Sequence, residues 1–471
     1  MRILFTAYLL RARNFQPLGL EYLSSSLKRC GHEVRLADAS LPKKLLKTVA
    51  QWRPHVIGYQ ALTGTHRSLL QLNSLLKRRF TFVAIFGGPH PTYFPEMIEQ
   101  QDVEMVCLGE ADDALLEVVS AISERRDPSS VKNFWIKHDG AITKNALRPL
   151  LSDLDRLPYP DWSLSDALSY CREFPVRSFM AARGCPFNCT FCYNSAFRDL
   201  YQGQQTFRQR KPGAVVEEIF WCYEQRPFSV AYLFDDTFGV NTDWIVQFCD
   251  VYRQKIRVPF FVQLRADVIS EKVVHQMAQS GLIGVGLGVE VGSEDIRIRL
   301  LNKRISNKEL LNAASILKKY GVRFIAYNIL GLPETTLEDD IATLRFNWQM
   351  KPDFAESLMF QPYPRTALGE NAAALGYFSG DPDEIPHTMK RKSPLKLSDY
   401  NQRVRLMHLF SLLAAYPVSE PILRLLLNIP LDSGYRLISR VFDGFIKTRN
   451  IFRSSPSLSL TARALWYYLR F

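Results

Sequence analysis

Short apolar runs with the character of β-strands alternate with helical patterns along most of this 471-residue chain. Before residue 125 such runs occur at 3–7, 33–37, 56–59, 82–86 and 105–108. Strands that alternate with helices favour a parallel sheet with helices on both faces. The sequence therefore predicts an α/β fold with a doubly wound (Rossmann-like) N-terminal domain. Ligands of such sheets lie beyond the carboxyl ends of the strands.

The alternation resumes with longer units after residue 175. The strand-like runs lie at 176–181, 230–234, 260–264, 283–289, 323–329 and 354–360. Six strand–helix units are too few to close an eight-stranded barrel, so we expect a partial barrel. Functional residues of barrels collect at the carboxyl ends of the strands. One glycine-rich run, Gly284-Val-Gly-Leu-Gly288, lacks the last glycine of a dinucleotide fingerprint and lies inside a predicted strand. We interpret it as close packing at the barrel wall.

Three cysteines follow the first of these later strands. Cys185, Cys189 and Cys192 have the spacing C-x₃-C-x₂-C, and Gly184 and Pro186 indicate a loop. Soft thiolate ligands select iron–sulfur clusters, zinc or copper. A cubane cluster normally takes four ligands, so three cysteines leave one iron open. The alternatives are a zinc site, which needs a fourth ligand at a typical spacing, and three unrelated core cysteines.

The loop with Ala182-Arg-Gly-Cys-Pro and Cys-x-Phe-Cys resembles the signature of the radical S-adenosylmethionine (SAM) enzymes. The resemblance implies a partial (β/α)₆ radical SAM barrel and a [4Fe-4S] cluster whose open iron chelates the amino and carboxylate groups of SAM. Reductive cleavage of SAM then gives a 5′-deoxyadenosyl radical, so the cofactor carries the difficult chemistry. It also implies an external one-electron donor of the flavodoxin or ferredoxin type.

The same resemblance implies SAM-binding residues at the ends of successive barrel strands. In the family an acidic group after the second strand holds the methionyl amine, a carboxylate after the fourth accepts from the ribose, and basic residues neutralise the SAM carboxylate. From the residues alone, each side chain could instead be solvated or cap a helix. The positions are Tyr193, Asp235, Asp236, Arg265, Glu290, Ser293, Lys303, Arg304 and Asn328.

The N-terminal domain resembles the cobalamin-binding domain that precedes the barrel in one radical SAM subgroup. The matching residues are Pro17-Leu-Gly-Leu-x-Tyr22, Gly87-Gly-Pro-His-Pro-Thr92 and Gly109-Glu110. The Asp-x-His-x-x-Gly segment, whose histidine ligates cobalt in many cobalamin proteins, is absent. As alternatives, His90 holds its own turn together, or the sheet has lost its ligand. The implied cobalamin-binding residues are Thr63, Gly87, Gly88, His90, Gly109 and Glu110.

We expect a cobalamin-binding domain at 1–140, a linker at 141–175, the barrel at 176–370 and a helical basic region at 371–471. Residues 401–471 contain ten Lys or Arg and three Asp or Glu, so they supply seven of the net +12 charges. Amphipathic helices are expected at 397–415, 421–427, 435–447 and 458–469. They either cap the barrel or contact an anionic membrane surface.

No recognised nucleic-acid-binding module, secretory signal or run of about 18 apolar residues occurs, so we expect neither nucleic acid nor a transmembrane helix. The clustered cysteines indicate a reducing compartment and metal binding. The predicted location is the cytoplasm, with a peripheral contact at the inner face of the membrane as one option.

The resemblance implies a cobalamin-dependent radical SAM C-methyltransferase that acts on an unactivated carbon of a small-molecule or lipid substrate. One SAM methylates cobalt and another supplies the activating radical. The alternatives are a ring-forming or rearranging (cyclase-type) enzyme with the same cofactors and a non-catalytic sensor of redox state or cobalamin.

Overall fold

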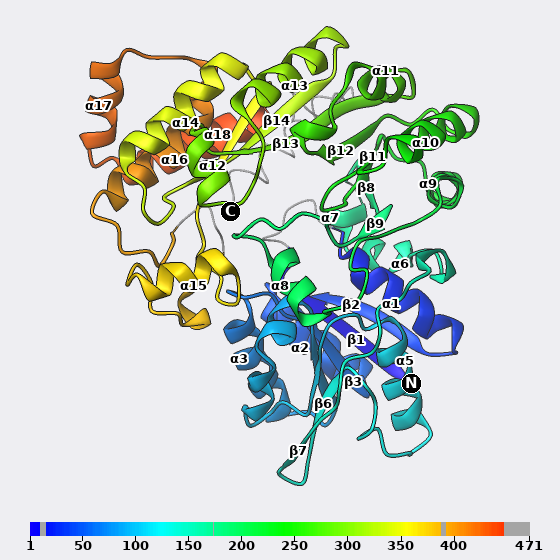
Figure 1. Ribbon diagram of the computed structural model, residues 1–471. Coiled ribbons are helices and arrows are strands. Elements are labelled where there is room, and N and C mark those ends of the chain that lie inside the picture. The colour runs from blue at the N-terminus through cyan, green and yellow to red at the C-terminus, as the bar shows by residue number, and fades with distance from the viewer. Residues whose placement is uncertain (10–15, 173, 388–391, 447–471) are drawn as a thin grey trace. The chain divides into compact units, whose positions relative to one another are not determined.

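The computed structural model describes residues 1–9, 16–172, 174–387 and 392–446 (Figure 1). The chain forms two compact units. The first contains Met1–Phe174 and Tyr201–Gln205, and the second contains Pro175–Leu200 and Thr206–Phe471. The expected linker thus groups with the first unit up to Phe174, and the C-terminal region groups with the barrel. The helix predicted at 458–469 lies outside the described residues.

The first unit is built on a seven-stranded sheet in the order β2-β1-β3-β4-β5-β6-β7. The five predicted strands are confirmed and all pair in parallel. They are β1 (Arg2–Ala7), β2 (Glu33–Asp38), β3 (Val56–Gln60), β4 (Val83–Gly87) and β5 (Met105–Cys107).

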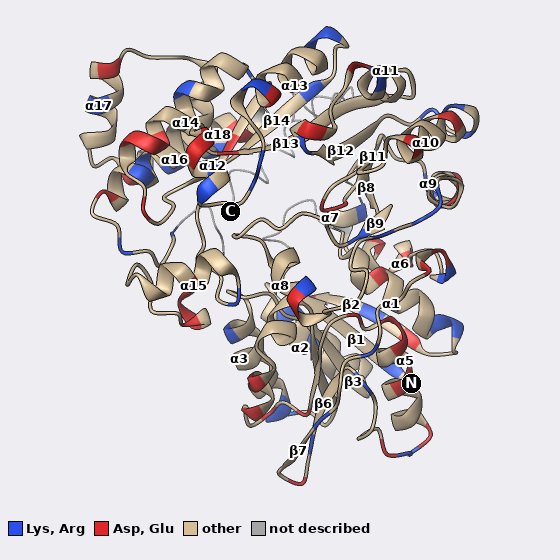
Figure 2. Cartoon of the chain, viewed as in Figure 1, with Lys and Arg blue, Asp and Glu red and all other residues tan. Residues whose placement is uncertain are grey.

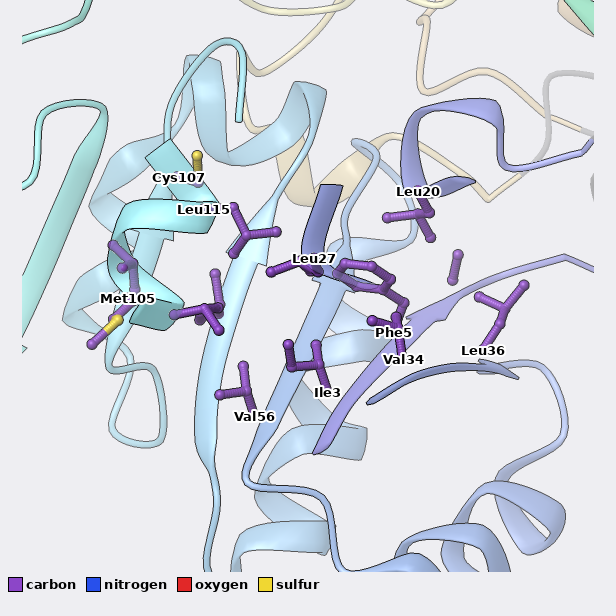
Figure 3. Close-up of a cluster of buried hydrophobic side chains, with 14 of the residues drawn as sticks. Ile3, Phe5, Leu20, Leu27, Val34, Leu36, Val56, Met105, Cys107 and Leu115 are labelled. Carbon is purple, nitrogen blue, oxygen red and sulfur yellow. The ribbon is translucent and has the colours of Figure 1, made fainter. Parts of the chain in front are cut away.

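Helices cover both faces of this sheet, which is why its strands are apolar at nearly every position. Ile3 and Phe5 of β1 pack in one core with α1 (Leu18–Arg29) and α5 (Asp112–Ser123), as Figure 3 shows. Leu4, between them, packs in the other core with α2 (Pro42–Trp52) and α3 (His66–Lys77). The doubly wound architecture is therefore confirmed.

Two antiparallel strands extend the sheet beyond the prediction. β6 (Phe134–His138) pairs with β5, and β7 (Ala141–Lys144) pairs with β6. The turn between them is Asp139-Gly140, with φ of 48° and 80°. Asp-Gly is a strong signal for a two-residue hairpin because both residues tolerate positive φ. The sequence contained this signal and our prediction overlooked it.

The second unit contains a six-stranded parallel sheet in the order β15-β14-β13-β12-β11-β8. In the described sheet β8 and β15 are the two edges, so the barrel is partial, as predicted. Ser306 and Thr336 form capping boxes that begin α13 (Asn307–Lys319) and α14 (Leu337–Met350). The strands are β8 (Val176–Phe179), β11 (Val230–Leu233), β12 (Phe260–Leu264), β13 (Leu282–Glu290), β14 (Arg323–Leu330) and β15 (Phe354–Met359).

Other helices between these strands include α9 (Pro212–Gln225), α10 (Thr242–Lys255) and α11 (Glu271–Gln279). In β13, three alternate glycines lie close against other side chains of the barrel unit. A Cβ atom at Gly284 would come 2.9 Å from the Phe261 ring, and one at Gly286 would come 2.0 Å from Gln263 Oε1. At Gly288 it would come 2.4 Å from Glu290 Oε1. Close packing therefore explains this glycine run, as we expected.

Three C-terminal helices, α16 (Tyr400–Ala415), α17 (Glu420–Asn428) and α18 (Asp432–Ile446), belong to the second unit. Leu406, Leu409 and Phe410 of α16 share a core with Ala355 and Met359 of β15. Within the described part of the chain, no helix has the length and apolar content needed to cross a membrane. Lys and Arg are interspersed with Asp and Glu on the described elements (Figure 2).

Arg403 fixes α16 to the barrel through buried polar contacts. Its side chain is 1% exposed and lies 2.6 Å from Asp399 Oδ1 and 3.4 Å from Asp340 Oδ2. Its Nη1 also donates to Thr335 Oγ1 at 3.0 Å. A guanidinium with several fixed acceptors suits such a site better than a lysine ammonium does.

We expect Arg403→Ala to lower the free energy of unfolding of the second unit by about 3–5 kcal/mol, because the buried Asp340 carboxylate loses its partner. Arg345→Ala is the matched control, since the Arg345–Glu420 pair also joins the barrel to a C-terminal helix but is exposed. The control should cost no more than about 1 kcal/mol. Urea unfolding measures both variants, and equal losses would refute this view of Arg403.

Candidate functional site

The cysteine loop lies between β9 (Ala182–Arg183) and α8 (Tyr193–Leu200). β9 pairs antiparallel with β10 (Arg208–Gln209), which closes the base of the loop. Gly184 has a φ of 78°, and a Cβ atom there would lie 2.3 Å from the Thr206 carbonyl oxygen. Only glycine fits this position without a backbone shift.

Two side chains from neighbouring elements hold the backbone around the first cysteine. Asp235 follows β11, and its Oδ1 accepts the Ala181 and Ala182 N–H groups at 2.8 and 2.7 Å. Arg198 of α8 donates to the carbonyl oxygens of Pro186 at 2.9 Å and Phe187 at 2.7 Å. Burial raises the pKa of Asp235 to about 7, with the two N–H donors acting in the opposite direction. Asp235, predicted to bind SAM, therefore fastens the cysteine loop to the end of β11.

The three cysteine side chains are half-buried and unoxidised. Burial raises the pKa of all three thiols, to about 11 for Cys185, and the neighbouring cysteines add to the shift at Cys185. Among the described residues, no three His, Cys, Asp or Glu side chains are placed to hold a single metal ion. A cubane makes a different demand, because each cysteine thiolate binds its own iron corner. Three nearby thiols on one loop fit that arrangement.

Of the predicted SAM residues, Arg265 contacts the cysteine loop directly and Asp236 acts on its thiols by charge. The Arg265 guanidinium lies 3.4 Å from the centroid of the Phe187 ring and hydrogen-bonds the Cys189 side chain. Its Nη2 is 2.8 Å from Asp267 Oδ2. Asp236 is hydrogen-bonded to the Asn194 side chain, and its charge raises the pKa of Cys185 and Cys192.

Glu290 and Lys303 form a buried ion pair at the carboxyl end of β13. Lys303 Nζ is 2.7 Å from Glu290 Oε1 and donates to the Gly288 carbonyl oxygen at 2.7 Å. Both charges act on Cys189, so the pair lies near the loop. Glu290 has a φ of 65°, and the β13–β14 register shifts just before it. Such an irregularity redirects a side chain at a strand end, often at a functional site.

The other predicted SAM residues have different surroundings. Ser293 caps α12 (Glu294–Arg299) by accepting the Ile296 N–H at 3.4 Å. Asn328 donates to the Glu356 carbonyl at 3.0 Å and accepts from Asn347 at 2.8 Å, so its amide bonds within the barrel wall. The ring of Tyr193 packs 5.1 Å from that of Tyr363, and Arg304 is exposed.

Sequence reasoning missed three residues that shape this site: Phe187, Asn194 and Arg198. Asn194 and Arg198 lie four residues apart in α8, directly after the last cysteine. Residues at that spacing share one face of a helix, so the sequence already placed both on one side of α8. Phe187 gave no signal apart from its place inside the loop.

In the first unit, the residues predicted to bind cobalamin lie at the carboxyl ends of β3, β4 and β5. Thr63 Oγ1 and His90 Nδ1 are 3.2 Å apart and tie the loop after β3 to the loop after β4. The His90 ring stacks on His66 with centroids 3.6 Å apart and lies 4.9 Å from Phe94. Burial, and secondarily His66, lowers the pKa of His90 to about 3, so the ring is neutral.

The glycines of this site allow the backbone to turn tightly. Gly88 has a φ of 104°, with the Ala61 carbonyl oxygen 3.1 Å from where a Cβ atom would be. Gly87, the last residue of β4, precedes it. Thr92 Oγ1 donates to the Gly88 carbonyl at 2.8 Å and accepts the Gly109 N–H at 3.0 Å, which joins the loops after β4 and β5. Glu110 Oε2 accepts the Leu151 N–H at 3.4 Å.

Neighbouring parallel strands thus bring the six predicted cobalamin residues to one edge of the sheet. Gly88 and Gly109, both with positive φ, let these loops turn tightly at the edge where ligands of such sheets bind. These surroundings fit a cobalamin, with His90 engaged by Thr63 and His66.

Family models match two stretches of the chain. The B12 binding domain matches residues 11–119, and the Radical SAM superfamily matches residues 180–346. The chain belongs to the B12-binding radical SAM superfamily. The second match covers the cysteine loop and the ends of β11, β12 and β13, and the first covers the loops after β3, β4 and β5.

Relatives of this radical SAM protein include an uncharacterized methyltransferase of Pyrococcus horikoshii, 28% identical over 76% of this chain and 78% of its own length. The anaerobic magnesium-protoporphyrin IX monomethyl ester cyclase of Rubrivivax gelatinosus is 26% identical over 76% of this chain and 66% of its own length. Among solved structures, the radical SAM methyltransferase TsrM of Kitasatospora setae has a TM-score of 0.67 and 16% identity, covering 79% and 76% of the two chains. The TsrM match shows the fold.

As a radical SAM enzyme with a B12-binding domain, the protein uses a [4Fe-4S] cluster, SAM and cobalamin. Enzymes of this superfamily also require an external electron donor. The surroundings of Cys185, Cys189 and Cys192 fit the cluster, and those of Gly88, His90 and Gly109 fit the corrinoid.

We expect the stability of the first unit to fall as the pH drops from about 6.5 towards about 3. In that window the unfolded chain protonates His90, whereas the folded protein keeps it neutral. At pH 5 the loss reaches about 2 kcal/mol. Urea unfolding at pH 8 and pH 5 measures it. His90→Gln should flatten the pH dependence, whereas exposed His138→Gln should leave it unchanged; identical profiles for all three proteins would contradict this expectation.

Proposed function

We propose that this protein is a cobalamin-dependent radical SAM methyltransferase that methylates an unactivated carbon of a small-molecule or lipid substrate. The observation that carries the proposal is the pairing of two sites in one chain. One unit places three cysteines beside charged residues at the strand ends, and the other brings the cobalamin-type loops together. The name of the Pyrococcus horikoshii relative supports methyl transfer.

In this proposal the thiolates of Cys185, Cys189 and Cys192 hold the cluster. Bound there, the cluster with SAM supplies a radical able to take hydrogen from an unactivated carbon. The chain's own part is to fix the cysteine loop through Asp235 and Arg198 and to keep it half-buried, away from bulk water.

The charged residues around the loop are proposed to orient SAM by its polar groups. Lys303 offers an ammonium to the SAM carboxylate, and Asp236 offers a carboxylate to its amine. Glu290 is placed to accept hydroxyl groups of the ribose, with Lys303 steadying it at 2.7 Å. Charge-assisted hydrogen bonds of this kind are roughly twice as strong as neutral ones.

A polar group on neighbouring barrel strands is proposed to face the substrate. Gln263 of β12 donates to the hydroxyls of Tyr232 at 2.5 Å and Tyr327 at 3.3 Å, and the glycine at 286 leaves room for that bridge. Burial raises the pKa of Tyr232 to about 12, so its phenol stays protonated. Such groups offer hydrogen bonds rather than acid–base catalysis to a substrate.

A second candidate is ring formation or rearrangement with the same cofactors. The observation in its favour is the 26% identity with the protoporphyrin ester cyclase over 76% of this chain. Methyl transfer releases S-adenosylhomocysteine as well as 5′-deoxyadenosine, whereas the alternative reaction releases only the second. Quantifying both products by mass spectrometry separates the two.

We also propose that the protein works in a reducing cytoplasm, where thiol ligands stay available, with a flavodoxin or ferredoxin as electron donor. A peripheral membrane contact is supported by exposed apolar residues on α17 and α18, among them Leu425 and Leu437 at 59% and 56% exposure. Aliphatic side chains at that exposure suit a lipid interface.

Vesicle sedimentation tests the membrane contact. We expect the protein to sediment with vesicles that contain phosphatidylglycerol and Leu425→Glu/Leu437→Glu to weaken this binding, because each carboxylate opposes insertion of the apolar face. Tyr416→Ser, which alters an exposed ring that lies 6.2 Å from Phe442, is the control. Equal binding by the double variant and the wild type would contradict the proposal.

Cys189→Ala tests the proposed enzyme directly. We expect anaerobically reconstituted variant protein to lose most of its iron and sulfide and to cleave no SAM to 5′-deoxyadenosine. Cys222→Ala is the control, because Cys222 is buried in α9 away from the loop. It should keep the iron content and SAM cleavage of the wild type. A Cys189→Ala protein that still cleaves SAM would rule out the proposal.

A further inference from the structure

After the cysteine loop and α8, the chain passes from the barrel unit into the first unit for five residues and then returns to the barrel unit. Residues Tyr201–Gln205 group with the first unit, whereas Pro175–Leu200 before them and the residues from Thr206 onward group with the second. We call Tyr201–Gln205 the crossover segment. It immediately follows α8, whose first residue, Tyr193, is next to Cys192.

Within the first unit, the crossover segment packs on the loop predicted to bind cobalamin. Tyr201 is 2% exposed, and a Cβ atom at Gly109 would lie only 1.9 Å from its hydroxyl oxygen. Gly109 also has a φ of 68°, so the tyrosine and the backbone geometry both demand glycine there. The segment therefore forms part of the wall of the Gly109–Glu110 loop.

A second contact ties the segment to the same loop. Gln204 Oε1 accepts the Leu150 N–H at 2.8 Å, and the N–H of the next residue, Leu151, donates to Glu110 Oε2 at 3.4 Å. Gln204 and Glu110 thus accept hydrogen bonds from adjacent backbone N–H groups, those of Leu150 and Leu151. A shift of the Gly109–Glu110 loop would disturb both bonds.

The chain on either side of the crossover segment is bonded to the cysteine loop. On the N-terminal side, Arg198 donates to the carbonyls of Pro186 and Phe187. On the C-terminal side, the Thr206 carbonyl lies against Gly184, and β10 pairs with β9. The segment is too short to move far without pulling on one of these attachments.

We propose that the crossover segment is part of the cobalamin-binding site and that Tyr201 couples occupancy of that site to retention of the cluster. This inference rests on the proposed use of the Gly109–Glu110 loop for cobalamin. A ligand that orders this loop also restrains Tyr201, and through the chain it restrains α8 and the cysteine loop. Coupling between two sites is reciprocal, so the cluster also raises the affinity for cobalamin. Tyr201 acts as a positioning residue.

The test follows iron loss from full-length protein reconstituted anaerobically with iron and sulfide. A ferrous chelator is added with or without saturating hydroxocobalamin, and the rate of iron release is recorded. For the wild type we expect hydroxocobalamin to slow release by about fivefold or more, the lower end of typical couplings. Saturation removes differences in affinity from the comparison, and enzyme activity is not involved.

Four variants make the test specific. Tyr201→Ala removes the ring and should abolish protection by hydroxocobalamin, whereas Tyr201→Phe keeps the ring and should retain it. Gln202→Ala changes an exposed neighbour in the same turn and should behave as the wild type. Gln204→Ala removes only the hydrogen bond to Leu150 and should weaken the protection by hydroxocobalamin against iron release. This variant therefore tests the coupling even if Tyr201→Ala does not fold.

Full protection in the Gln204→Ala and Tyr201→Ala proteins would overturn the coupling and leave the proposed function standing. A wild-type protein that binds hydroxocobalamin without slower iron release would do the same. A wild-type protein that shows no hydroxocobalamin binding in an absorbance titration would instead remove the cobalamin site itself. The failure of this inference is thus distinguishable from failure of the proposed function.

Discussion

A loop can give three thiolates to one cluster only if its backbone is held in place before the cluster arrives. In this protein the Asp235 carboxylate fastens the start of the loop by accepting two successive N–H groups. The Arg198 guanidinium binds the carbonyls of Pro186 and Phe187, directly after the first cysteine. Gly184 lets the chain pass the Thr206 carbonyl. With these backbone N–H and C=O groups already hydrogen-bonded, the loop keeps its shape and presents the three cysteine side chains as ligands.

Parallel strands explain how distant residues reach this loop. Asp236 and Arg265 follow β11 and β12, Glu290 ends β13, and all three strands point the same way in one sheet. The same rule operates in the first unit, where the ends of β3, β4 and β5 bring together Thr63, His90 and Gly109. In both the doubly wound sheet and the partial barrel, the order of the parallel strands brings polar residues that are distant in sequence to one edge. Glycines near these strand ends leave room for the polar side chains.

The alternation of strand and helix patterns was enough to predict most of the fold, because the apolar pattern of parallel strands is local and strong. It could not separate Asp235 from Asp236. These neighbours make different contacts: Asp235 fastens the loop through two N–H groups, whereas the charge of Asp236 acts on Cys185 and Cys192. Asn328 shows the same limit, since its amide bonds into the barrel wall through Asn347, nineteen residues further along the chain. The packing of Tyr201 on Gly109 could not be predicted from a local sequence pattern, because the two residues come together only in the tertiary structure.

The proposed chemistry requires that the three-cysteine loop leaves one iron of the cubane available to SAM. Electron–nuclear double resonance on the reduced, cluster-loaded protein with SAM labelled with nitrogen-15 at its amino group tests this directly. We expect a hyperfine coupling between that nitrogen and the cluster. A spectrum with SAM bound but no such coupling would contradict it, because the fourth iron would then have another ligand.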